Sequence, residues 1–126
     1  MLNVNIFATD TMNPVVSISS STNSVKDGGN ITYTVKVADN EGIASFGLAA
    51  GKVRLNGFTA TEKFNIINAT TIEVVLTNIQ GTNGAKSVTI LSGVAIDYEG
   101  NKSQEVPATS FTLSNTEKVA PVLGIT

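Results

Sequence analysis

The chain has 126 residues, of which 41% are hydrophobic and only 14% charged, and its formal net charge is −2. One domain with a substantial core fits this length, whereas the weak charge excludes the dense basic patch that nucleic-acid binding needs. The chain contains no cysteine and no histidine, which excludes disulfides, thiolate metal sites and the commonest general base. We therefore expect no enzymatic activity.

Period-two alternation of apolar and polar residues is the main structural signal along the chain. It predicts strands, because successive side chains of a strand point to opposite faces of a sheet. The apolar sets expected to face the core are, in chain order, Ile31/Tyr33/Val35/Val37, Val53/Leu55 with Phe58, Phe64/Ile66, Ile72/Val74/Leu76 with Ile79, Val88/Ile90, and Phe111/Leu113. Near Gly93 the alternation slips, which predicts a β-bulge there.

Turn-forming residues separate these apolar sets. Stretches rich in Gly, Asn, Asp and Thr lie at 26–30, 38–42, 67–71, 80–84 and 97–101. Short strands with turns every 8–12 residues or so are typical of a β-sandwich. Since no stretch has a helical period, the sequence predicts an all-β sandwich of about seven strands.

The two ends of the chain carry similar segments. Pro14 and Pro121 lie 107 residues apart, and at this offset apolar residues align with apolar ones. The aligned pairs are Val4/Phe111, Ile6/Leu113, Thr9/Thr116, Asp10/Glu117, Val15/Val122, Val16/Leu123 and Ile18/Ile125. Because a fixed period marks a tandem array, we divide the chain into the end of a preceding repeat or an N-terminal strand (1–9), one complete repeat (10–116) and the start of the next repeat or a linker (117–126).

Four stretches carry a resemblance to a known family: PVV at 14–16, TYTVKVAD at 32–39, RLNG at 54–57 and GVAIDYEGN at 93–101. Together they resemble bacterial immunoglobulin-like repeats, over nearly the whole complete repeat. The resemblance implies an immunoglobulin-like sandwich of two antiparallel sheets with Greek-key connections. It also implies an extracellular or cell-surface location in a secreted bacterial protein, with neighbouring repeats of the same chain as partners. It implies no activity, because this fold hosts many functions.

Oxygen-bearing side chains gather in three segments that an up-and-down arrangement of strands would place at one pole of the sandwich. These segments are the linker before the first strand, the loop after the strand at 31–37 and the loop before the last strand. Their candidate ligands are Asp10, Asp39, Asn40, Glu41, Asp97, Glu99 and Asn101. Ca²⁺ takes about six to eight oxygen ligands, so this set is a candidate calcium site that would stiffen the junction between repeats.

Turn chemistry is the alternative explanation of the same residues. Asp and Asn at turn starts bond their own backbone, and Gly supplies a positive φ. The segment TEKVAP at 116–121, which corresponds to the first linker, has one acidic residue and adds Lys118. The weaker acidity of this second linker favours the turn interpretation, and both interpretations stay open.

Other candidate chemistry is weaker. Lys36 lies mid-strand, but its phase places it on the wet face, away from any Lys–Asn crosslink. Asp97 and Glu99 could form a glycosidase-like carboxylate pair, but they lie on a predicted turn tip. Tyr33 is in phase with the core, whereas Tyr98 at a turn tip is expected to be exposed and could contact a ligand.

The leading hypothesis is a non-enzymatic spacer or stalk in a surface adhesin or a large secreted protein. Two alternatives stay open: a module that binds a carbohydrate or a host protein, and an accessory domain of a secreted polysaccharide hydrolase. An aromatic content of 6% with no Trp weighs against sugar stacking. No apolar run approaches the ~20 residues of a membrane span, so we expect no membrane insertion and no nucleic-acid partner.

Overall fold

Strands make up nearly all of the regular structure. The computed structural model describes residues 10–115, and within them it contains eleven strands and one short 3₁₀ helix, η1 (Ala50–Lys52). The strands, in chain order, are β1 (Val15–Ser20), β2 (Ser24–Lys26), β3 (Ile31–Ala38), β4 (Ile43–Phe46), β5 (Val53–Asn56), β6 (Phe58–Asn68), β7 (Thr71–Gly81), β8 (Gly84–Ile90), β9 (Ala95–Asp97), β10 (Val106–Pro107) and β11 (Phe111–Ser114). The predicted all-β class is confirmed.

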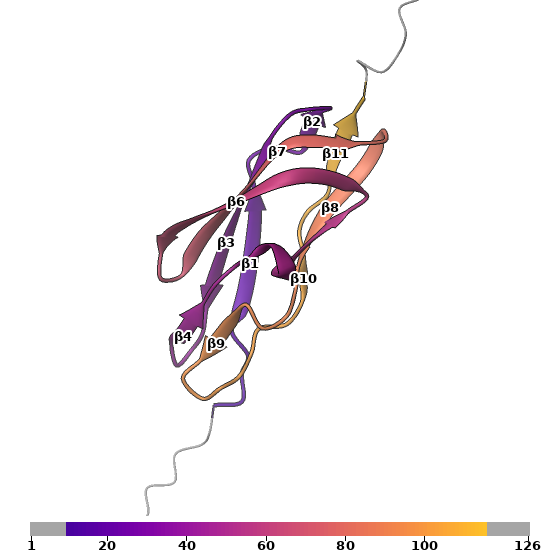
Figure 1. Cartoon of the computed structure of the whole chain (residues 1–126). Helices are drawn as coiled ribbons and strands as arrows, with labels where there is room; N and C mark the ends of the chain where they lie inside the picture. The colour runs from indigo at the N-terminus through magenta and orange to yellow at the C-terminus, as the bar shows by residue number, and fades with distance from the viewer. Residues whose placement is uncertain (1–9, 116–126) are drawn as a thin grey trace, which may run out of the picture.

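The strands form two main sheets (Figure 1). One sheet has the order β1-β3-β7-β6, with antiparallel pairing throughout. In the other, β8 pairs with β5 along one side and with β10 and then β11 along the opposite side, and β2 joins β11 in parallel. The two sheets enclose the core as an immunoglobulin-like sandwich.

The eleven segments combine into seven longer strands, in agreement with the predicted number. The consecutive segments β4 and β5 pair with β9 and β8, respectively. Therefore β4 and β5 form one interrupted strand, and β8 and β9 form another. The first strand is divided between the sheets as β1 and β2, and the last strand consists of β10 and β11. The interruption between β8 and β9 contains Gly93 at φ +84°, so the alternation slips at a turn that breaks the strand and not at the predicted β-bulge.

The core lies between the sheets and is mainly aliphatic. Its buried residues are Val16, Val25, Ile31, Tyr33, Val35, Val37, Val53, Phe58, Val74, Leu76, Ile79, Val88, Ile90, Val94, Ala95, Phe111 and Leu113. Burial of one such aliphatic or aromatic side chain contributes about 1.5–3 kcal/mol. In β3 the buried residues alternate with more exposed ones, and Lys36 is exposed, so the predicted phase of this strand is confirmed.

Two positions show where the simple alternation fails. Ile66 was expected to share the buried face of Phe64, but it is 78% exposed. The expectation is wrong because β6 runs past the core toward a hairpin tip, with a register shift between Ile66 and Asn68. In β7, Asn78 adopts φ 53°, and this left-handed residue reverses the phase, so that Ile79 is buried after Leu76.

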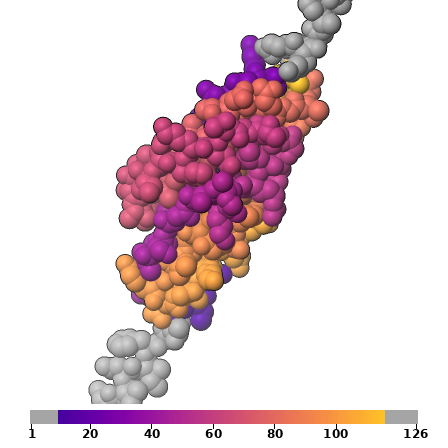
Figure 2. Space-filling view, in the orientation of Figure 1, coloured from indigo at the N-terminus to yellow at the C-terminus, as the bar shows by residue number. Residues whose placement is uncertain are grey.

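The two described ends of the chain lie at opposite ends of an elongated body (Figures 1 and 2). We call the end that contains residues 10–14, 39–42 and 97–101 the N-terminal pole. The end that contains β2, the β7–β8 turn and the end of β11 is the C-terminal pole. The predicted segments 1–9 and 117–126 lie outside the described residues.

The Tyr33 hydroxyl is a buried polar group in an otherwise apolar core. Tyr33 is 0% exposed, and its hydroxyl has no hydrogen-bond partner among residues 10–115. Burial raises the pKa of Tyr33 from about 10 to about 12. The folded state therefore holds this proton more tightly than the unfolded state does.

Replacement of Tyr33 by phenylalanine should leave the free energy of unfolding at pH 7 unchanged or increase it by about 1 kcal/mol, because an unpaired buried hydroxyl is costly. The contribution of the Tyr33 proton to stability is complete below pH 10 and is lost as the pH rises toward 12. Urea unfolding at pH 7 and pH 11 should therefore show a smaller alkaline loss for Tyr33→Phe than for the natural chain. A clear loss of stability at pH 7 would mean that the hydroxyl has a partner.

Candidate metal centre

Three aspartates that are distant in sequence meet at the N-terminal pole. Asp10 lies in the linker before β1, Asp39 directly follows β3, and Asp97 ends β9. Each contributes one carboxylate oxygen to a group in which all three oxygens lie within 4.8 Å of one another. The topology produces this meeting, since the start of β1, the end of β3 and the end of β9 all lie at this pole (Figure 1).

Asp97 is the fixed member of the group. It is 2% exposed, and its Oδ1 accepts the backbone N–H groups of Glu99 at 2.9 Å and Asn101 at 2.8 Å. Its Oδ2 accepts the side-chain amide of Asn101 at 2.9 Å. Burial raises the pKa of Asp97, but hydrogen bonds from Asn101, from the Asp10 side chain and from the Glu99 N–H outweigh it and hold the pKa below its ordinary value.

Asp10 and Asp39 each use one carboxylate oxygen, and the other oxygen of each has no donor among residues 10–115. Oδ1 of Asp10 accepts the N–H of Met12 at 3.0 Å, and Oδ1 of Asp39 accepts the N–H of Glu41 at 2.9 Å. The Oδ2 atoms of both aspartates are buried and have no hydrogen-bond partner within the described part of the chain. Turn chemistry thus accounts for one oxygen of each residue, and the second oxygen is available to a ligand.

The group repels itself electrostatically. The N–H of Met12 lowers the pKa of Asp10, but desolvation, a side-chain hydrogen bond with Asp97 and the charges of Asp39 and Asp97 outweigh it and raise the pKa. A bound cation would remove this repulsion. With no histidine or cysteine in the chain, all available donors are oxygen atoms, which suit hard cations such as Ca²⁺ and Mg²⁺.

Asn101 positions the aspartates. Its side-chain Nδ2 donates both to Oδ2 of Asp97 and, at 2.6 Å, to the backbone oxygen of Asp10. One amide therefore joins the linker before β1 to the turn after β9. Gly100 at φ +86° closes the same turn, and its N–H donates to the backbone oxygen of Asp97 at 3.2 Å.

The predicted ligands divide into two groups. Asp10, Asp39 and Asp97 come together as the topology argument expects, and Asn101 holds two of them in place. The side chains of Asn40, Glu41 and Glu99 are exposed, and no contact joins them to the carboxylate group. Ser103 was not predicted: it is 1% exposed, and its hydroxyl accepts the N–H of Ala95 at 3.1 Å beside the turn.

The remaining sequence candidates lie where their phase predicted. Lys36 is exposed and Tyr33 is in the core, whereas Tyr98 is 71% exposed. The Tyr98 ring covers Gly42, where an added Cβ would lie 3.2 Å from the ring. Glu99 is exposed beside the buried Asp97, so this pair does not face a common cleft.

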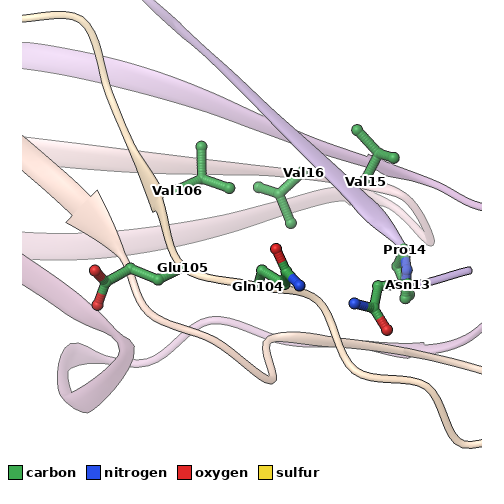
Figure 3. A pocket seen from close by; sticks show the side chains of 7 residues that line it. All are labelled: Asn13, Pro14, Val15, Val16, Gln104, Glu105 and Val106. Atoms are coloured by element: carbon green, nitrogen blue, oxygen red, sulfur yellow. The ribbon is translucent and has the colours of Figure 1, made fainter.

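A groove of about 270 Å³ lies at the side of the sandwich, between residues 13–16 and residues 104–106 (Figure 3). Its apolar residues are Pro14, Val15, Val16 and Val106, and Asn13 and Gln104 provide polar side chains. Glu105 at its rim forms an exposed ion pair with Arg54 at 3.6 Å. The groove is smaller than most small-molecule sites, which measure roughly 300–1,000 Å³, and its lining suggests no reaction.

No protein-family model matches the chain, and no curated protein matches it significantly. Among the residues that the structure describes, no helix has the length and apolar character to cross a membrane. The function is therefore inferred from the residues and their arrangement.

Proposed function

We propose that this chain is a non-enzymatic structural module in which Asp10, Asp39 and Asp97 bind one calcium ion at the N-terminal pole. The ion fixes the incoming linker to the sandwich. The module acts as a spacer between neighbouring modules of a bacterial secreted or cell-surface protein.

The convergence of Asp10 with Asp39 and Asp97 is the single observation that carries the proposal. Asp10 precedes the first strand, yet its carboxylate lies within 4.8 Å of two carboxylates from the body of the sandwich. Two of these residues keep a buried oxygen with no donor in the described structure, which is costly without a cation. The protein offers few oxygens in all, so solvent completes the coordination shell. Ca²⁺ accepts variable coordination geometry, whereas Mg²⁺ requires a near-ideal octahedron.

The spacer role rests on the placement of the chain ends and on the sequence repeat. The first and last described residues leave the sandwich at opposite poles (Figure 2), which permits end-to-end connection of like modules. The similarity between the segments around Pro14 and Pro121 supports such an array. In an array each module contacts mainly its neighbours, so a cation at the pole would set the geometry of the joint.

Calcium titration tests the proposal. We expect Ca²⁺ to raise the melting temperature, because a ligand at 100 times its dissociation constant stabilises the folded state by about 2.7 kcal/mol. That corresponds to a shift on the order of 10 °C for a domain of this size. Differential scanning calorimetry in EDTA and in millimolar Ca²⁺ measures it.

The variant Asp10→Asn sharpens the test, because it separates repulsion from binding. In EDTA it should be at least as stable as the natural chain, since one repelling charge is gone, yet its melting temperature should no longer respond to Ca²⁺. The exposed Glu99→Gln on the same pole is the matched control and should keep the full response. An equal response of Asp10→Asn and the natural chain, or no response of either, would refute the site.

A further inference from the structure

The edges of the two sheets are protected to different degrees. An exposed strand edge presents unpaired N–H and C=O groups, and proteins shield such edges with charges, proline, bulges or short length. In the first sheet β6 is shielded. Its pairing with β7 has register shifts at two places, Lys63 is exposed on it, and Glu62 lies half-buried among its inward-facing residues with a buried Oε1.

The outer strands of the second sheet are shielded as well. β5 has four residues and includes Arg54, which is exposed. β2 has three residues and ends with the exposed Lys26, and the two-residue β10 ends with Pro107. None of these edges offers a long, uncharged run.

β1 lacks all of these protective features. It has six residues, VVSISS, with no charge and no proline, and its register with β3 is continuous from Val15–Ala38 to Ser20–Tyr33. The N–H of Ser21 donates to the backbone oxygen of Thr32 at 2.9 Å, so Ser21 and Thr32 are a hydrogen-bonded pair. Hydrogen-bonded and non-hydrogen-bonded pairs alternate along an antiparallel ladder, so Ser19 and Ser17 are in hydrogen-bonded pairs as well. Ser17 and Ser19 therefore direct their backbone groups toward β3.

The backbone N–H and C=O groups of Val16, Ile18 and Ser20 consequently face away from the sheet. Figure 3 shows the groove beside the start of β1, where residues 104–106 run alongside without pairing to it. Among residues 10–115, β3 is the only strand that pairs with β1, so within the described structure no strand occupies the other edge of β1.

We propose that β1 pairs antiparallel with β1 of a second copy of this chain, across a twofold axis at Ile18. This register joins all three outward-facing residues: Val16 with the partner's Ser20, Ile18 with the partner's Ile18, and Ser20 with the partner's Val16. Centring the axis on Ser17 or Ser19 joins fewer of them. Each such pair exchanges two N–H···O bonds, and the two four-stranded sheets become one continuous sheet.

The side chains fit this pairing on both faces. On the inner face the half-buried Ile18 meets its own symmetry copy and loses exposed apolar area. On the outer face Ser17 lies opposite the partner's Ser19, and both are small and exposed. Across the strands of this outer face, the neighbouring residues are in turn Lys36, Ser17, the partner's Ser19 and the partner's Thr34.

The β1 residues that would meet in this pairing are all uncharged, so no charge opposes a second copy at this edge. The strand is self-complementary: each outward-facing residue finds a neutral partner of fitting size. The inference does not depend on the cation, because Val16 to Ser20 lie outside the aspartate group.

Sedimentation velocity over a range of concentrations tests the pairing. We expect the natural chain to approach twice its monomer mass as the concentration rises. The double variant Ser17→Glu/Ser19→Glu places carboxylates opposite one another at both outer positions, so dimerisation should weaken about tenfold. The variant Ser17→Glu/Ser19→Lys makes the same positions complementary and should restore the dimer.

Thr61→Glu, on the exposed face of β6, is the control and should dimerise like the natural chain. Amide hydrogen exchange of Val16, Ile18 and Ser20 in the natural chain gives a second readout, since these amides should become protected as the concentration rises. A chain that stays monomeric, or a Ser17→Glu/Ser19→Glu variant that dimerises as well as the restored one, would overturn the proposal.

Discussion

Replacement of Phe111 by alanine should reduce the free energy of unfolding by about 3–5 kcal/mol. Phe111 is 2% exposed and begins the four-residue strand β11, which joins β8 to β2. Its loss leaves a cavity that the short strand cannot close by moving, because β11 is paired on both sides. Urea denaturation monitored by circular dichroism measures the loss, and Phe46→Ala, at a half-buried position, should cost less.

Part of this loss comes from one aromatic contact. The ring centroids of Phe58 and Phe111 are 5.2 Å apart and the ring planes meet at 80°. This edge-to-face geometry stabilises the fold by about 0.5–1.5 kcal/mol in addition to the burial of the two side chains. A double-mutant cycle with Phe58→Leu and Phe111→Leu should return a coupling energy of this size. Strict additivity of the two single changes would contradict a specific ring interaction.

Replacement of Asp97 by alanine should lower the melting temperature by on the order of 10 °C, even in EDTA. The carboxylate accepts two backbone N–H groups and one side-chain amide, so its removal leaves these donors unpaired at the end of β9. Calorimetry in EDTA separates this loss from any effect of calcium. A melting temperature within about 2 °C of the natural chain would contradict the structural role.

An exchange of donor and acceptor identifies the responsible bonds. Asp97→Asn alone places an amide against the amide of Asn101 and should be destabilising. The double variant Asp97→Asn/Asn101→Asp reverses the polarity of that bond and should recover part of the loss. Full recovery is not expected, because the Asn101 amide also donates to the backbone oxygen of Asp10.

Most of the fold was accessible from the sequence because its core is built by simple alternation. Ile31 to Val37 and Ile72 to Leu76 are buried as the period of two predicts. The alternation could not foresee interruptions that depend on backbone conformation. The three-residue step from Leu76 to Ile79 marks a change of phase in β7, but the sequence does not show that Asn78 produces it at φ 53°.

The sequence predicted where the candidate site lies, but it did not predict which of the acidic residues form it. The strand order alone put three acidic segments at one pole, and Asp10, Asp39 and Asp97 do meet there. Which acids turn inward depends on turn geometry, and Glu41 and Glu99 contribute backbone N–H groups to neighbouring aspartates instead of side-chain oxygens. One sequence signal was available for Asp97, since it shares the buried face of Ala95 in β9.

The parallel pairing of β2 with β11 has a mechanical consequence. The chain reaches β2 from the N-terminal pole, whereas β11 leads out at the C-terminal pole (Figure 1). A force that separates the two poles therefore pulls these strands past one another along their own direction. The ladder from Ser24–Thr112 to Lys26–Ser114 is loaded in shear, so its hydrogen bonds must break together and not one after another.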